Sequence, residues 1–163
     1  MSKTEFILNE SELTLTAKRT FNATQHEVWK AHTTPELLEK WYGPEPWYVT
    51  TVSMDFSVGG KGYHYCMNGP EGEKMYALTK YLEIRPEEYY KAEDYFVDET
   101  GTIDENMPAG MKIENTFTAD GDKTHLLSIT TFASIEAMKQ TIEMGVQEGL
   151  GIAHDQLDAL LTN

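Results

Sequence analysis

The sequence is poor in the features on which several classes of protein depend. It has one cysteine, Cys66, in 163 residues, so no disulfide can form within the chain and a reducing compartment is expected. No apolar run approaches the roughly 18 residues that a membrane-spanning helix needs. Residues Met1 to Leu15 contain no apolar stretch typical of a signal peptide. These absences favour a cytoplasmic protein that does not associate with membranes.

Basic side chains are also scarce, with 13 lysines and arginines against 27 acidic residues and a formal net charge of -14. This charge repels phosphate backbones and anionic lipid surfaces, so neither nucleic acid nor a membrane is an expected partner. The segment from Glu83 to Glu105 contains nine acidic residues and only two basic ones, Arg85 and Lys91. This excess indicates a solvated, self-repelling hairpin, with a site for a cation or a basic partner as the alternative.

The length of the chain fits a single domain. Residues 1–12 are interpreted as a polar N-terminal tail and residues 13–163 as the domain. Apolar residues alternate with polar ones from Leu13 to Phe21, which predicts a half-buried strand. Thr24 and Glu27 have the spacing of a capping box at the start of a short helix. Pro35 begins a second short helix, because proline at the first helical position loses no hydrogen bond.

The remainder of the chain predicts strands followed by one long helix. Apolar residues recur at steps of three and four from Ser134 to Leu161, which indicates an amphipathic helix. Gly145, Gly149 and Gly151 weaken it, so either the helix kinks there or another segment packs closely against it. Further strands are predicted over residues 48–56, 63–67, 75–84, 89–97, 111–117 and 125–132, with a loop over 100–110. A curved antiparallel sheet with a long C-terminal helix on one face is an α+β arrangement.

Several short stretches, taken in order, resemble a known family. They are Arg19–Phe21, Val28–Ala31, Thr34–Leu38, Trp41–Pro44, Val58–Gly60, His64–Met67, Gly69–Gly72, Tyr81–Ile84, Pro86–Glu87, and Gly145–Gly149 leading to Leu157 and Leu160–Leu161. In these stretches the chain is similar to the SRPBCC (START-like) superfamily, and within it to the family of activator of heat-shock protein 90 ATPase homologues (AHSA-like). The resemblance implies a helix-grip fold, in which a seven-stranded sheet wraps around the C-terminal helix and leaves a cavity between them. Relatives bind lipids, sterols, polyketides or hormones, and some are cyclases or dehydratases.

Tyrosines and methionines are the candidate cavity residues. Tyr63, Tyr65 and Met67 share one face of their strand, because side chains alternate along a strand. One face of the final helix carries a second apolar set, and in this fold the two faces confront each other. A tyrosine has an apolar body and a polar tip, which suits a ligand that is mostly apolar with one or two polar groups. The predicted lining residues are Trp41, Tyr63, Tyr65, Met67, Tyr81, Met138, Ile142 and Val146; a plainly filled core is the alternative.

No set of residues predicts catalysis, a metal site or a cofactor. The five histidines lack zinc-binding spacings, and Cys66 has no basic neighbour in sequence to activate it. Glu83 alternates with Tyr81, so its carboxylate either faces the cavity as an acid or base, or points to solvent.

Three functions are therefore open. The first is binding of an apolar or aromatic small molecule between the sheet and the final helix. The second is an enzyme of the cyclase, dehydratase or hydrolase kind, which requires a titratable group inside the cavity. The third is a protein-interaction module with a chaperone as partner, which requires a large exposed apolar patch. A homodimer is common enough to be expected, although the sequence does not give the oligomeric state.

Overall fold

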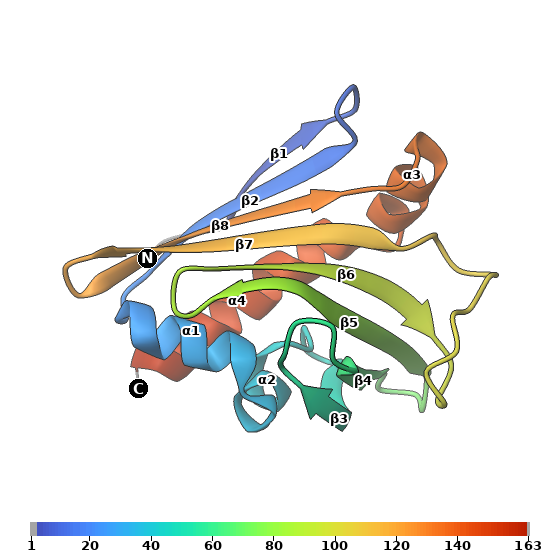
Figure 1. The fold of residues 1–163 in the computed structure, drawn as a ribbon, viewed down its shortest axis with the longest axis horizontal. Helices are drawn as coiled ribbons and strands as arrows, with labels where there is room; N and C mark the ends of the chain where they lie inside the picture. Colours follow the sequence, from blue (N-terminus) through green and yellow to red (C-terminus); the bar gives the residue numbers. More distant parts are fainter. Residues whose placement is uncertain (1–2, 163) are drawn as a thin grey trace.

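The computed structural model describes residues 3–162, which form one eight-stranded sheet and four helices (Figure 1). The strands are β1 (Glu5–Asn9), β2 (Thr14–Phe21), β3 (Tyr48–Asp55), β4 (Gly62–Asn68), β5 (Lys74–Arg85), β6 (Tyr89–Val97), β7 (Met111–Asp120) and β8 (Lys123–Thr131). The helices are α1 (Gln25–Thr33), α2 (Pro35–Trp41), α3 (Ile135–Glu143) and α4 (Val146–Thr162).

The strands are ordered β1-β2-β8-β7-β6-β5-β4-β3, and every neighbouring pair is antiparallel. The sheet curves, and α4 crosses one of its faces (Figure 1). Ala153 and Leu157 of α4 are buried there in one cluster with Phe21, Phe117 and other side chains of that face. We call this face of the sheet the inner face. The arrangement confirms the predicted α+β helix-grip fold.

Both short helices begin as the sequence predicts. The Thr24 hydroxyl accepts a hydrogen bond from the Glu27 backbone N–H, and the Glu27 carboxylate accepts one from the Thr24 backbone N–H. Pro35 occupies the first turn of α2. The Trp41 indole then donates a hydrogen bond to the Ala31 carbonyl at 2.9 Å, which ties α2 to α1. These local contacts hold the two helices at one end of the sheet, beside the C-terminal half of α4 (Figure 1).

The N-terminal segment differs from the predicted polar tail over residues 1–12. Residues 5–9 form β1, an edge strand that pairs with β2, so the sheet has eight strands where the resemblance implied seven. Ile7 and Leu8 remain 52% and 44% exposed, and Phe6 packs partly against a buried cluster. Backbone hydrogen bonds to β2 are therefore the main interaction that stabilises β1. Such bonds do not require an alternation of apolar and polar residues, so the sequence does not display the strand.

The predicted long C-terminal helix is broken into two. Gly145 adopts φ +87°, a left-handed conformation that favours glycine, and it ends α3 before α4 begins at Val146. Of the two explanations for the glycines in this segment, a break in the helix therefore applies to Gly145. Gly149 lies against Pro44, where an added Cβ would be 3.4 Å from a carbon of the proline ring, a distance of ordinary van der Waals contact. Within residues 3–162, no helix is long and apolar enough to cross a membrane.

Candidate functional site

A cluster of tyrosines occupies the inner face over β4, β5 and β6. Tyr63 and Tyr65 alternate on β4 and stack with ring centroids 4.8 Å apart. Tyr81 of β5 and Tyr90 of β6 meet edge to face at 5.6 Å. Tyr42, which follows α2, meets Tyr65 edge to face at 5.6 Å. These contacts bring phenol groups from three strands and one helix end to the same region of the molecule.

Asp94 lies on the inner face beside these phenols. It is on β6, and its register partner on β5 is Thr79, whose hydroxyl donates a 2.6 Å hydrogen bond to Asp94 Oδ1. Burial raises the pKa of the Asp94 carboxyl to about 6, and the hydrogen bond from Thr79 acts in the opposite direction. Within residues 3–162, no lysine, arginine or histidine forms an ion pair with Asp94. The site therefore contains a carboxyl with no partner of opposite charge.

The phenols around Asp94 are neutral across the physiological pH range. Burial raises the pKa of the Tyr63 phenol to about 12, although a hydrogen bond with Thr51 opposes the shift. Burial raises the phenol pKa further elsewhere in the cluster, and the Asp94 charge adds to it, at Tyr42, Tyr65, Tyr81 and Tyr90. Neutral phenols can donate or accept hydrogen bonds, but they do not neutralise a carboxylate.

Asn115 adds a second polar group to the inner face. It is the register partner of Tyr90 and is 6% exposed. Its side-chain nitrogen donates a 2.7 Å hydrogen bond to the Tyr90 hydroxyl. Its Oδ1 is fully buried and, among the described residues, accepts no hydrogen bond. An unpaired buried acceptor costs folding free energy, typically about 1–3 kcal/mol, so it calls for a donor.

The inner face is closed at one end and partly open at the other. At the end covered by α1, α2 and the C-terminal half of α4, side chains such as Phe21, Phe117 and Leu126 are buried. Toward α3 and the loop that follows β6, inner-face residues are only half-buried (Figure 1). We call this set the open end: Met67, Ala77, Asp94, Phe96, Met111, Ile113 and Thr130.

A recess of about 610 Å³ adjoins the open end. Met75 and Phe96 contribute to its wall, and both belong to the inner face. The recess ends before Asp94, which is two residues from Phe96 on the same face of β6. Its other walls carry the apolar Trp47, Val97 and Met107, the aromatic Tyr76, the basic Lys74 and the acidic Glu73, Asp98, Glu99 and Asp104. A volume of this size fits a small organic molecule.

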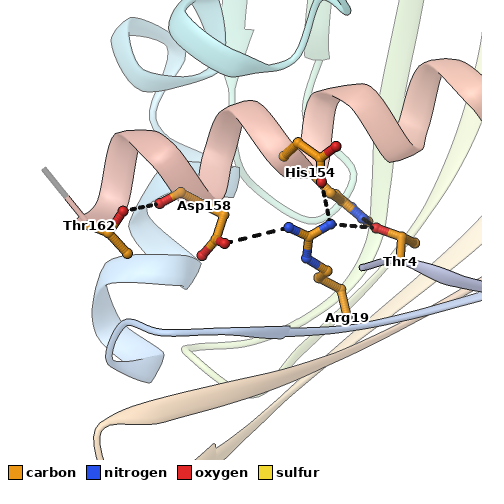
Figure 2. Close-up of polar contacts among 6 residues, drawn as sticks. Thr4, Arg19, His154, Asp158 and Thr162 are labelled. Atoms are coloured by element: carbon orange, nitrogen blue, oxygen red, sulfur yellow. Dashed lines mark hydrogen bonds and ion pairs between the residues drawn. The ribbon is translucent and has the colours of Figure 1, made fainter. Parts of the chain in front are cut away.

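Helix α4 is attached to the sheet by a buried arginine (Figure 2). The Arg19 side chain, on β2, is fully buried, and its Nη1 donates to Asp155 Oδ1 at 2.7 Å and to the Thr4 hydroxyl at 3.2 Å. Its Nη2 lies 3.5 Å from Asp158 Oδ2. The Thr4 hydroxyl also shares a 2.8 Å hydrogen bond with His154 of α4. The arginine therefore joins the helix, β2 and the segment before β1.

Two buried histidines belong to the closed end. Burial lowers the pKa of His32 to about 4. Burial, with the nearby His32 and Arg19, lowers the pKa of His154 to about 3. The His32 Nδ1–H donates to the Val28 carbonyl at 2.9 Å, and its ring packs on Trp41. Both imidazoles are neutral at pH 7 and pack as aromatic residues.

The predicted cavity residues fall into two clusters. Trp41, Tyr63, Tyr65, Met67 and Tyr81 lie together in the larger cluster with α4 residues. Met138, Ile142 and Val146 lie in a second cluster with Leu15 and Phe132. Val146, the first residue of α4, packs with the α3 residues Met138 and Ile142, whereas Ala153 and Leu157 further along α4 pack with the larger cluster. The predicted confrontation of a single helix face with the β4 tyrosines is therefore not what the packing shows.

Glu83 takes the solvent-facing alternative. A β-bulge between Tyr81 and Glu83 interrupts the alternation, so Tyr81 pairs with the buried Ala92 and Glu83 pairs with Lys91. Glu83 is 44% exposed and forms an ion pair with Arg85 at 2.5 Å. The carboxyl of the inner face is instead Asp94, which in the sequence stands out only as part of the acidic excess. Its spacing of two and four residues from Ala92 and Tyr90 was the signal that it shares their face.

Comparisons with known proteins agree with this fold. The family model described as "Activator of Hsp90 ATPase homolog 1-like protein" matches residues 22–162. The crystal structure of protein Ms6760 from Mycobacterium smegmatis is 33% identical, with a TM-score of 0.89, and the match covers 98% of this chain and 96% of that one.

Other solved structures are similar. A solution structure of a protein from Arthrobacter aurescens is 30% identical with a TM-score of 0.90, over 97% of this chain and 91% of that one. A solution structure of a protein from Staphylococcus epidermidis is 32% identical with a TM-score of 0.79, over 95% and 93%. A comparison with curated proteins found no match. The chain belongs to the family of proteins like the activator of Hsp90 ATPase homolog 1.

Proposed function

We propose that this protein binds an apolar or aromatic small molecule between the inner face of its sheet and the C-terminal helix. The observation that carries the proposal is the half-buried open end, where a carboxyl lies among phenols on a face that is otherwise core. A sheet face that only fills a core buries its side chains fully and avoids an unpaired ionisable group. The adjoining recess of about 610 Å³ supports the same function, since two of its wall residues, Met75 and Phe96, belong to the inner face.

The predicted lining residues enter this proposal in two roles. Tyr63, Tyr65 and Tyr81 would form the aromatic wall beside Asp94, with Trp41 behind them and Met67 toward the entrance. Val146 begins α4 and is half-buried, so it would border the open end from the helix side. Met138 and Ile142 would support that border from α3.

A dye that is uncharged and fluoresces in apolar surroundings, such as Nile red, tests the cavity directly. The wild-type protein is expected to bind it with a one-to-one stoichiometry. Ala77→Trp adds a large side chain at the half-buried open end, opposite Tyr65, and is expected to abolish dye binding. Ala119→Trp adds the same volume at an exposed position of β7 and should leave binding unchanged. Circular dichroism establishes that both variants are folded.

Native mass spectrometry of protein purified from its own host identifies the ligand class if a small molecule is retained. A wild-type protein that neither binds the dye nor retains a molecule would refute the proposal. So would an Ala77→Trp variant that is folded and binds the dye like the wild type.

Catalysis is the second candidate, and the pKa of Asp94 favours it. A carboxyl with a pKa of about 6 can both accept and release a proton near neutral pH, as an acid–base catalyst must. Its test is the turnover of any identified ligand. Loss of turnover in Asp94→Asn with retained binding would establish the catalytic role.

The family description raises a chaperone partner as the third candidate. Addition of this protein to purified Hsp90 should then raise the ATPase rate, and an unchanged rate would exclude this role. We also propose that the protein is cytoplasmic and forms a homodimer. Sedimentation of the purified protein would measure its oligomeric state.

A further inference from the structure

We propose that the ligand is an organic amine, whose ammonium group binds Asp94 while its apolar body lies among the tyrosines. This inference rests on the proposed binding function and specifies the chemistry of that site. It is carried by two acceptor atoms, Asp94 Oδ2 and Asn115 Oδ1, that accept no hydrogen bond within residues 3–162, and by the absence of an ion-pair partner for Asp94 among the same residues.

The first acceptor is Asp94. Its Oδ1 accepts the hydrogen bond from Thr79, whereas its Oδ2 accepts none from residues 3–162. Oδ2 is also not among the fully buried polar atoms of the described chain, so a bound molecule can reach it. An ammonium group at Oδ2 would supply both a donor and the missing positive charge. The charge-assisted hydrogen bond that forms is stronger than a neutral one.

The second acceptor is Asn115 Oδ1, which is buried and without a donor among the described residues. It lies deeper than Asp94, because its register partner Tyr90 is four residues before Asp94 on β6. Four residues of strand span about 13 Å. A ligand with an ammonium group near the open end and an N–H or hydroxyl at its inner end can serve both acceptors.

The groups near Asp94 favour a cation over an anion. The Asp94 charge adds to burial in raising the phenol pKa of Tyr42, Tyr65, Tyr81 and Tyr90, and all four phenols are neutral at pH 7. Aromatic ring faces attract cations, which adds to the attraction of the carboxylate. A carboxylate or phosphate ligand would face Asp94, which has no ion-pair partner within residues 3–162, and a protein of net charge -14. Arg19, on the same face of the sheet, is already paired with Asp155 and Asp158 of α4.

The experiment compares three probes with the same indole body: tryptamine, which is a cation; tryptophol, which is neutral; and indole-3-acetate, which is an anion. Isothermal titration calorimetry at pH 7.5 and low salt measures each Kd. The wild-type protein should bind tryptamine at least tenfold more tightly than tryptophol, and should bind indole-3-acetate weakest. Asp94→Asn keeps the shape of the side chain and an oxygen for Thr79, and it should abolish the preference for the amine.

Asp122→Asn is the matched control. It removes one negative charge from the exposed turn between β7 and β8, outside the recess, so it tests whether the preference arises from net charge alone. It should keep the tenfold preference. Equal affinity of the wild type for tryptamine and tryptophol would overturn the inference, and so would an amine preference that survives Asp94→Asn. If tryptamine does not bind while Nile red does, the amine inference fails and the binding function stands. If none of the probes and no dye binds, both fail.

Discussion

Replacement of Asp94 by asparagine should stabilise the folded protein. The carboxyl of a free aspartate has a pKa of 3.8, whereas burial raises that of Asp94 to about 6. Ionisation is therefore harder in the folded state, and the ionised group opposes folding. Asparagine is neutral, has almost the same shape and keeps an oxygen for the hydrogen bond from Thr79. The substitution removes the penalty and preserves the contact.

The magnitude follows from the two pKa values. Each tenfold difference in proton affinity between the folded and unfolded states corresponds to about 1.4 kcal/mol. Ionised Asp94 therefore destabilises the fold by about 3 kcal/mol at most at pH 7, and less if water screens the half-buried carboxyl. The penalty is fully present above the folded pKa and disappears as the pH falls from about 6 toward 3.8. At pH 5 the gain from Asp94→Asn should be about half of the gain at pH 7.

Urea unfolding of the wild type and the variant at pH 7 and pH 5 measures both gains. The comparison must be made between proteins at each pH, because the wild type alone carries other titrations. His32 and His154 have lowered pKa values, so their contribution to stability is lost as the pH falls below 6.5. That loss is common to both proteins and cancels. Glu99→Gln controls for the change in net charge. A variant that is less stable than the wild type at pH 7, or a gain equal at both pH values, would refute the reasoning.

Four further predictions concern the helix, the core and the ligand. Arg19→Ala should lower the free energy of unfolding, measured in urea, by about 3–5 kcal/mol, because the half-buried Asp158 then has no ion-pair partner. A loss under 1 kcal/mol would contradict the buried ion pair. Gly145→Ala should destabilise the folded state by about 1–2 kcal/mol, because residue 145 has a positive φ, and should therefore lower the urea midpoint of unfolding. An unchanged midpoint would show that α3 and α4 are not held in this geometry. Leu157→Ala, at a fully buried position of α4, should cost about 2–5 kcal/mol in the same assay, and a near-zero cost would mean that the helix does not cover the sheet. The Kd of tryptamine should rise about tenfold from pH 7 to pH 5 as Asp94 takes up a proton, and Asp94→Asn should show no such rise.

Local patterns predicted most of the elements correctly. The capping box at Thr24 and Glu27 and the proline at the start of α2 depend on contacts within four residues, so the sequence displays them directly. The strand that carries Tyr63 and Tyr65 was also visible from alternation alone. β1 was not, because it is an edge strand whose apolar Ile7 and Leu8 stay exposed, and it gains most from pairing with β2.

The candidate site was harder to predict because bulges and breaks change which side chains share a face. One extra residue at Leu82 moves Glu83 to the outer face, and nothing in the local composition marks that bulge. The glycine at 145 was recognised as a weak point of the helix. Its consequence, that Met138 and Ile142 join a cluster separate from the β4 tyrosines, depends on where α3 packs.

The sequence by itself determined the class of fold, the order of the elements and the faces of the regular strands, since these follow from periodicities of two and 3.6 residues and from end signals. Only the tertiary structure decided which polar groups lie inside. Burial raises the pKa of Asp94 and the hydrogen bond from Thr79 on β5 opposes that rise, while Arg19 meets a partner 136 residues away on α4. Such environments depend on strand register and helix placement, which are set by the packing of the whole chain.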